Sequence, residues 1–109
     1  MVYILLAPGF EEMEALVPAD LLRRAGLEVA LTTVGPALVP GGHNITVQAD
    51  LTLDQITLKA GDMVVLPGGG AGALGGDDLA VLHQADPLLG DGSGELGLQP
   101  GVAHRFFAR

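Results

Sequence analysis

Two stretches of the sequence, VYILLAPGF at residues 2–10 and MVVLPGGG at residues 63–70, constrain the fold more than any other feature. Each begins with a continuous apolar run, which is typical of a strand covered on both faces. Each run ends at a proline and a glycine, which turn the chain. In an open parallel sheet, the carboxyl ends of such strands meet at one edge, where binding sites form. The sequence therefore predicts a site built from the residues that follow the two runs.

A helix is expected between the first run and the next strand. Glu11, Glu12 and Glu14 come at its start, where carboxylates complement the helix macrodipole. Gly26 is a natural stop, and residues 28–34 are expected as the next strand. An apolar stripe at helical spacing is expected to face the core; its members are Met13, Leu16, Val17, Leu21 and Ala25. Strand, helix and strand with short links predict a right-handed βαβ unit and a mostly parallel α/β sheet.

The rest of the chain divides into a patterned part and a tail. Residues 41–50 are expected as a short extended excursion, and residues 51–58 as a brief helix or turn. Residues 67–76 are expected as a glycine loop, after which 77–85 are expected to begin another helix. Beyond Asp86 no hydrophobic period is found, so the stretch 90–101 is predicted to be loop or disorder.

Composition limits the class of protein. A chain of 109 residues is one domain at most, with a modest core. Five basic against thirteen acidic residues give a net charge of −8, which disfavours nucleic acid and anionic membranes as partners. No segment approaches the roughly 18 apolar residues of a membrane span, and the start lacks the basic residues of a signal peptide. A cytoplasmic location is therefore expected.

Glu14 and the glycines after residue 67 are the candidates for chemistry. Pro18 has no N–H to donate to the carbonyl of Glu14, so Glu14 is expected at a disturbed turn beside a strand end. A carboxyl partly buried there could share a proton with a neighbour. Gly68, Gly69 and Gly70 could bring backbone N–H groups close to a ligand or an oxyanion. The alternative is that Glu11, Glu12 and Glu14 are simply solvent-exposed carboxylates that cap the start of the helix.

Cofactor and metal sites have weaker support in the sequence. The loop 68–76 contains a formal G-x-G-x-x-G at Gly70, Gly72 and Gly75, so a small nucleotide-binding domain stays an alternative. No second βαβ unit follows to supply the ribose carboxylate, and no cofactor is expected. The three histidines, His43, His83 and His104, are isolated in sequence from one another and from any acidic pair at ligand spacing. No metal site is predicted.

The motifs together resemble the DJ-1/ThiJ/PfpI family, in its DJ-1 branch, over residues 2–85. The likeness rests on APGFEEMEALVPADLLRRAG, which includes Pro18, Asp20 and the Arg23-Arg24 pair, and on DMVVLPGGG. It implies a flavodoxin-like α/β sandwich of the class I glutamine amidotransferase-like kind, usually a homodimer that uses the first helix. Members include glyoxalases, proposed deglycases and stress-response proteins, which act on small aldehydes or glycated substrates. By the same resemblance, Glu14 would hydrogen-bond the reactive cysteine and lower its pKa, and Gly69 would offer an oxyanion-hole N–H.

The chain departs from the family at the nucleophile, because it contains no cysteine. The region where the family carries its cysteine elbow reads LQPGVAH at residues 98–104. Residues 97–107 can be back-translated to DNA and the DNA read again in a frame that starts at the third base of each codon. The residues that this shifted frame allows are compatible with an elbow that contains a cysteine. We hypothesise that the reading frame slipped between about Leu88 and Leu96. Residues 1–109 are thus predicted to be a single incomplete domain, truncated before the elbow, with a divergent, frame-shifted or disordered tail at 86–109. Such a chain would be inactive as an enzyme; the further alternative is a non-enzymatic dimerisation or interaction module.

Overall fold

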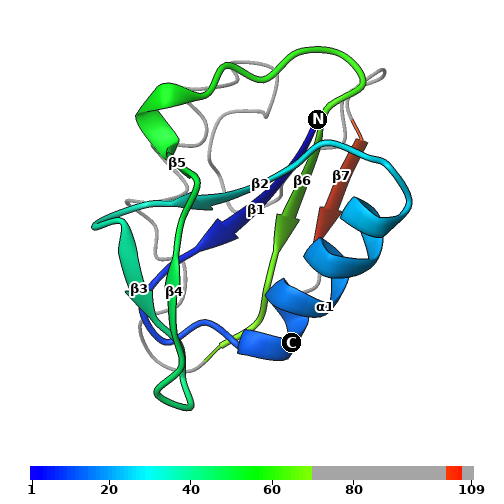
Figure 1. Cartoon of the computed structure of the whole chain (residues 1–109). Helices are drawn as coiled ribbons and strands as arrows, with labels where there is room; N and C mark the ends of the chain where they lie inside the picture. Colours follow the sequence, from blue (N-terminus) through cyan, green and yellow to red (C-terminus); the bar gives the residue numbers. More distant parts are fainter. Residues whose placement is uncertain (70–102, 107–109) are drawn as a thin grey trace.

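A computed structural model describes residues 1–69 and 103–106 of the chain, and these form an α/β fold around a five-stranded sheet (Figure 1). The strand order is β5-β2-β1-β6-β7, and every neighbouring pair is parallel. The strand bounds are β1 Val2–Leu6, β2 Val29–Thr33, β5 Leu51–Thr52, β6 Met63–Leu66 and β7 Ala103–Phe106. The predicted mostly parallel sheet is confirmed.

Alternating side chains of the central strands divide the core into two parts, one on each face of the sheet. On the face covered by helix α1 (Glu12–Arg24), Ile4 and Leu6 pack with Ala15 and Ala19. The residues on the opposite face include Tyr3, Leu5, Leu53, Ile56 and Leu58. The continuous apolar run of β1 follows from this arrangement, because both of its faces are covered and all five of its residues are buried.

Helix α1 packs through Ala15 and Ala19, with Leu16 and Leu22 partly buried beside them; this confirms Leu16 of the predicted apolar stripe and corrects the rest, since Ala25 is exposed. Ala15 and Ala19, four residues apart, are buried against the sheet. Met13, Val17 and Leu21 instead lie on the outer face and are exposed. The helix ends as predicted: Gly26 follows with a φ of +85°, a conformation that suits glycine.

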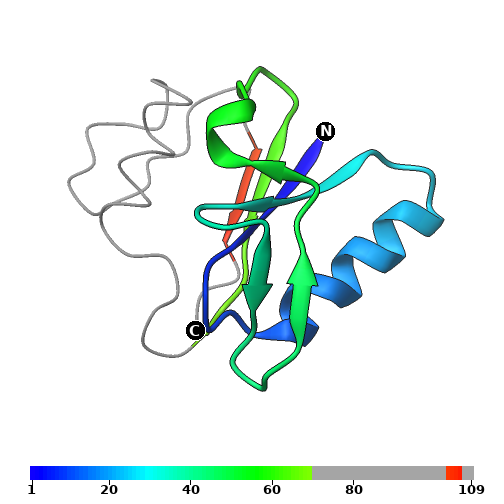
Figure 2. The same cartoon turned by 60° about the vertical axis from the view of Figure 1, so that its left-hand side comes forward.

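A hairpin stands beside this sheet. Strands β3 (Leu38–Pro40) and β4 (Thr46–Gln48) pair antiparallel, with Val39 opposite Val47. The excursion predicted for residues 41–50 is therefore the second half of a hairpin. The segment predicted as a brief helix or turn begins with β5 and continues as a 3₁₀ turn, η1, at Leu53–Gln55. Figure 2 shows the hairpin next to the start of α1, where Gly42 donates its N–H to the carbonyl of Phe10 at 2.9 Å.

Strand β7 lies within the tail in which no regular element was expected. It extends the sheet beyond β6, with Val64 opposite His104 and Leu66 opposite Phe106. The sequence AHRF is not a continuous apolar run like that of β6, so no strand was indicated there; the edge of β6 supplies the hydrogen-bonding partners that place β7 in the sheet. The predicted course of the glycine loop beyond Gly69 and the helix predicted at 77–85 lie outside the described residues. In the described part of the chain, no helix has the length and apolar character needed to cross a membrane.

Candidate active site

The candidate site lies where β1 and β6 end, at the carboxyl edge of the sheet. The chain leaves β1 through Pro8 and Gly9, and it leaves β6 through Pro67 and Gly68. The two exits are joined by an antiparallel bridge between Phe10 and Gly69. The N–H of Glu11 also donates to the carbonyl oxygen of Gly68 at 2.6 Å. The residues after the two apolar runs thus meet at one edge, as the sequence predicts.

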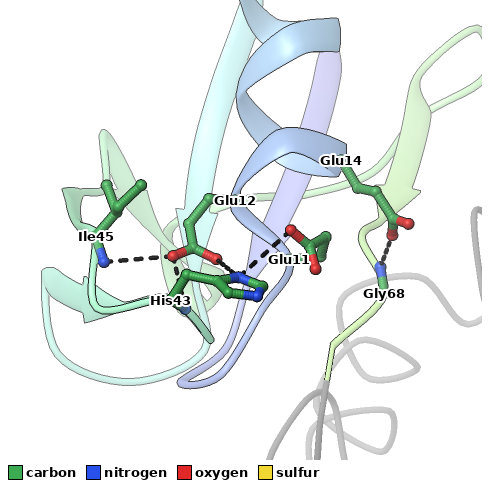
Figure 3. A network of polar contacts seen from close by, with 6 residues as sticks. All are labelled: Glu11, Glu12, Glu14, His43, Ile45 and Gly68. Carbon is green, nitrogen blue, oxygen red and sulfur yellow. Dashed lines mark hydrogen bonds and ion pairs between the residues drawn. The ribbon is translucent and has the colours of Figure 1, made fainter.

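Glu14 points from the first turn of α1 to the glycine turn that follows β6 (Figure 3). Its Oε2 accepts a hydrogen bond from the N–H of Gly68 at 2.6 Å, across 54 residues of sequence. A Cβ at position 68 would lie 2.5 Å from that oxygen, so the approach requires glycine. The Glu14 side chain therefore reaches the turn that contains Gly69, the other predicted site residue. The chain holds no thiol that could complete a cysteine site there.

A second cluster of polar groups lies beside the first turn of α1, formed by Glu11, Glu12 and His43 (Figure 3). Glu12 is only 3% exposed. Its Oε2 accepts the N–H groups of His43 at 2.8 Å and Ile45 at 3.3 Å. Its Oε1 lies 3.1 Å from the Nδ1 atom of the His43 ring, and Glu11 Oε1 lies 3.6 Å from the same nitrogen.

These contacts set the charges of the cluster. Burial works against ionisation of Glu12, yet hydrogen bonds from its own N–H, from the His43 ring and from the N–H groups of His43 and Ile45 lower its pKa from 4.5 to about 2. The hydrogen bond to Glu12, aided by the negative charges of Glu11 and Glu12, raises the pKa of His43 above 6.5. Glu12 is therefore an ionised carboxylate at neutral pH, held by donors on the hairpin.

The expectation that the histidines are isolated from any acidic pair is wrong for His43. The turn between β3 and β4 brings it to Glu11 and Glu12 across more than thirty residues. Its place depends on the Gly41-Gly42 pair, because a Cβ on Gly41 would overlap the side chain of Glu12. Two adjacent glycines between extended segments are the sequence signal that could have indicated this close approach.

The other histidines and the nucleotide alternative remain sequence predictions. His83 lies outside the described residues, and His104 is placed only as a position in β7. Of the loop 68–76 only Gly68 and Gly69 belong to the described part, so the predicted G-x-G-x-x-G lies beyond it.

The parallel sheet, with a carboxylate and a glycine turn at the carboxyl ends of its central strands, defines a flavodoxin-like α/β protein with a site at that edge. The sequence model described as the DJ-1/PfpI family matches residues 1–83. The chain belongs to the DJ-1/PfpI family.

Individual relatives cover the same part of the chain. Protein dj-1beta of Drosophila melanogaster is 40% identical over 79 residues, which cover 70% of this chain and 42% of that protein. Deglycase TK1284 of Thermococcus kodakarensis is 37% identical over 70 residues, or 64% of this chain and 42% of the deglycase. The oxidized DJ-1 of Toxoplasma gondii superposes with a TM-score of 0.66 at 30% identity, covering 77% of this chain and 46% of that structure. The chain thus spans less than half the length of each of these relatives.

Proposed function

We propose that this chain carries the carboxylate-bearing part of a cysteine-dependent DJ-1/PfpI glyoxalase, deglycase or stress-response protein, and that it has no such activity by itself. The observation that carries the proposal is the contact between Glu14 and the N–H of Gly68 at the carboxyl ends of the central strands. Relatives named as deglycases support the class of activity. The 109 residues include no cysteine, so the nucleophile of that chemistry is missing from them. A cytoplasmic location is part of the same proposal.

In the intact form of such a site, Glu14 and Gly69 would have different tasks. The Glu14 carboxyl would hydrogen-bond a cysteine thiol and favour its thiolate, which is the reactive form. The N–H of Gly69 would stabilise the oxyanion that forms when the thiolate attacks a carbonyl carbon. The substrate would be a small aldehyde or a glycated molecule, because a thiolate adds to such carbonyl groups.

The test compares the chain as it stands with a version, called here the repaired chain, in which the hypothesised frame shift is reversed so that a cysteine is encoded. DNA sequencing across codons 85–109 first shows whether a continuous frame restores a cysteine. We expect no consumption of methylglyoxal by the present chain and measurable consumption by the repaired one. In the repaired chain, Glu14→Gln should lower kcat by about 100-fold or more, in the range typical of a proton-transfer group.

The matched control is Glu28→Gln, which changes an exposed glutamate away from the site. It should leave the activity of the repaired chain unchanged. Methylglyoxal consumption by the cysteine-free chain, or equal effects of the two glutamate substitutions, would contradict the proposal.

Self-association through α1 is a second candidate function, and the outer face of that helix favours it. Met13, Val17 and Leu21, spaced four residues apart, form an apolar row on this face. Their side chains are 71%, 46% and 59% exposed. We propose a second copy of this chain as the partner that covers the row, in line with the homodimer that the family resemblance implies.

Sedimentation velocity tests this candidate directly. The wild-type chain should sediment as a dimer at micromolar concentration, and Val17→Glu should convert it to a monomer. Leu27→Glu is the matched control, because Leu27 is also exposed but lies after the helix. A monomeric wild type, or loss of the dimer in both variants, would refute a dimer that uses this face.

A further inference from the structure

Three atoms that commonly ligate metals converge beside the first turn of α1. Glu11, Glu12 and His43 each offer one such atom, a carboxylate oxygen or an imidazole nitrogen, and the three atoms all lie within 4.8 Å of one another. The imidazole nitrogen stands 3.1 Å from the Glu12 oxygen and 3.6 Å from the Glu11 oxygen. Glu12 in the first turn of α1 and Glu11 just before the helix supply two of the atoms, and the turn of the hairpin supplies the third (Figure 3).

The spacing of these atoms suits a small divalent ion. Zinc binds imidazole nitrogen and carboxylate oxygen at about 2.0–2.2 Å, so two ligands of a tetrahedral ion are separated by roughly 3.3 Å. The two distances from His43 Nδ1 lie on either side of this value. An ion can therefore fit between His43 and either carboxylate, and movement of the Glu11 side chain would bring its oxygen, within 4.8 Å of the other two ligand atoms, to the same ion.

The buried ligand is already fixed in direction. Glu12 Oε2 accepts two backbone N–H groups, from His43 and Ile45, which leaves Oε1 turned to the imidazole. Hydrogen bonds to the second oxygen of a ligating carboxylate orient metal ligands in this way. The backbone hydrogen bonds to Oε2 thus hold Glu12 against the hairpin, and they do not involve the candidate ligand atoms Glu12 Oε1 and His43 Nδ1.

We propose that Glu11, Glu12 and His43 bind one divalent transition-metal ion of the zinc type. Two carboxylates offset the charge of the ion, and the imidazole favours zinc-like ions over magnesium or calcium, which take oxygen ligands. The His43 side chain is 70% exposed, so solvent can supply the remaining ligand. The ion would tie the start of α1 to the hairpin.

Isothermal titration calorimetry with zinc chloride tests the site on the whole chain, purified without a polyhistidine tag. The expected result is saturable binding of one ion per chain. Cobalt(II) should compete with zinc and show the visible absorption bands of a four-coordinate ion with nitrogen and oxygen ligands. Glu14 projects to the separate glycine turn, so zinc binding does not depend on the proposed enzymatic function.

Single substitutions separate this site from general zinc binding by an acidic protein. His43→Gln and Glu11→Gln change side chains at the surface, and each should weaken zinc binding at least about tenfold. Glu28→Gln is the matched control for charge and should bind zinc as the wild type does. Circular dichroism verifies that all variants keep the fold. Absence of saturable binding at millimolar zinc, or equal affinity in wild type, His43→Gln and Glu11→Gln, would overturn the proposal.

Discussion

Replacing Gly68 by alanine should displace the carboxylate of Glu14 without breaking the fold. The added Cβ would lie 2.5 Å from Glu14 Oε2, well inside van der Waals contact. The atom in the way is the end of a flexible side chain, so Glu14 swings aside and loses its 2.6 Å hydrogen bond to the N–H of residue 68. The change in stability caused by Gly68→Ala therefore measures the strength of the hydrogen bond between Gly68 and Glu14.

The size of the effect follows from two opposing contributions. A hydrogen bond to a charged group contributes about 1.5–3 kcal/mol to stability. Replacing glycine by alanine also lowers the conformational entropy of the unfolded chain. Where the native backbone conformation suits alanine, this stabilises the folded protein by about 0.4–1 kcal/mol. The net loss expected for Gly68→Ala is therefore about 1–2 kcal/mol. With a urea m-value of about 2 kcal/mol/M, the unfolding midpoint should fall by about 0.5–1 M.

Urea unfolding followed by circular dichroism measures this loss, with Gly35→Ala as the matched control. No heavy atom lies within 4 Å of a Cβ built on Gly35, so that substitution should be neutral or slightly stabilising. A double-mutant cycle then isolates the contact: in a Glu14→Ala background, Gly68→Ala should no longer destabilise the protein. The reasoning is refuted if Gly68→Ala costs the same with and without the Glu14 side chain.

Three further predictions concern the core and the surroundings of Glu12. Ile4→Ala empties a fully buried position of the central strand and should cost about 2–5 kcal/mol in urea unfolding, whereas Ile45→Ala, at an exposed position, should change the midpoint little. Gly41→Ala places a methyl group against Cγ and Cδ of a buried, firmly held Glu12, so the Tm should fall; an unchanged Tm would contradict the packing. Because the pKa of His43 is raised above 6.5, its contribution is complete below pH 6.5 and is lost as the pH rises through the folded-state pKa. Because the pKa of Glu12 is lowered from 4.5 to about 2, its contribution is present above pH 4.5 and is lost as the pH falls towards 2. Thermal melts in EDTA should therefore show the largest Tm difference between wild type and His43→Gln between pH 4.5 and 6.5, and a pH-independent difference would refute this linkage.

Strands β1 and β6 could be predicted from the sequence because each is a continuous apolar run that ends at a Pro-Gly pair, whereas β5 lies in a segment expected as a helix or turn and β7 in the patternless tail. The apolar runs 2–7 and 63–66 match β1 (Val2–Leu6) and β6 (Met63–Leu66) to within one residue. The buried face of α1 could not be found in the same way. Hydrophobicity correctly favoured Leu16, which packs against the core, but it also favoured the exposed Met13, Val17 and Leu21, whereas the fully buried positions are Ala15 and Ala19. A helix that packs closely on a sheet uses its small side chains, and a hydrophobic pattern alone does not report this.

The candidate site was predictable only in part, for a similar reason. Glu14 and Gly69 follow two recognisable strands, so the topology of a parallel sheet places them at one edge. His43 follows no such strand. It reaches Glu12 because a hairpin folds back over the start of α1 and two glycines allow close contact. Contacts made by a turn depend on tertiary placement, which residue spacing along the chain does not encode.

The three acids at the start of α1 divide their tasks because neighbouring positions on a helix face different ways. Residues two apart do not share a face, so Glu12 and Glu14 project to different neighbours, the hairpin and the glycine turn. Glu12, with its pKa lowered to about 2, is buried and bound by backbone N–H groups, and thus cannot exchange a proton with a substrate at neutral pH. Glu11 uses its backbone N–H to hold the carbonyl of Gly68. Of the three, Glu14 therefore has the carboxylate that reaches the turn after β6, which supports its proposed role at the strand ends, while the backbone N–H of Glu11 holds that turn and the Glu12 carboxylate holds the hairpin.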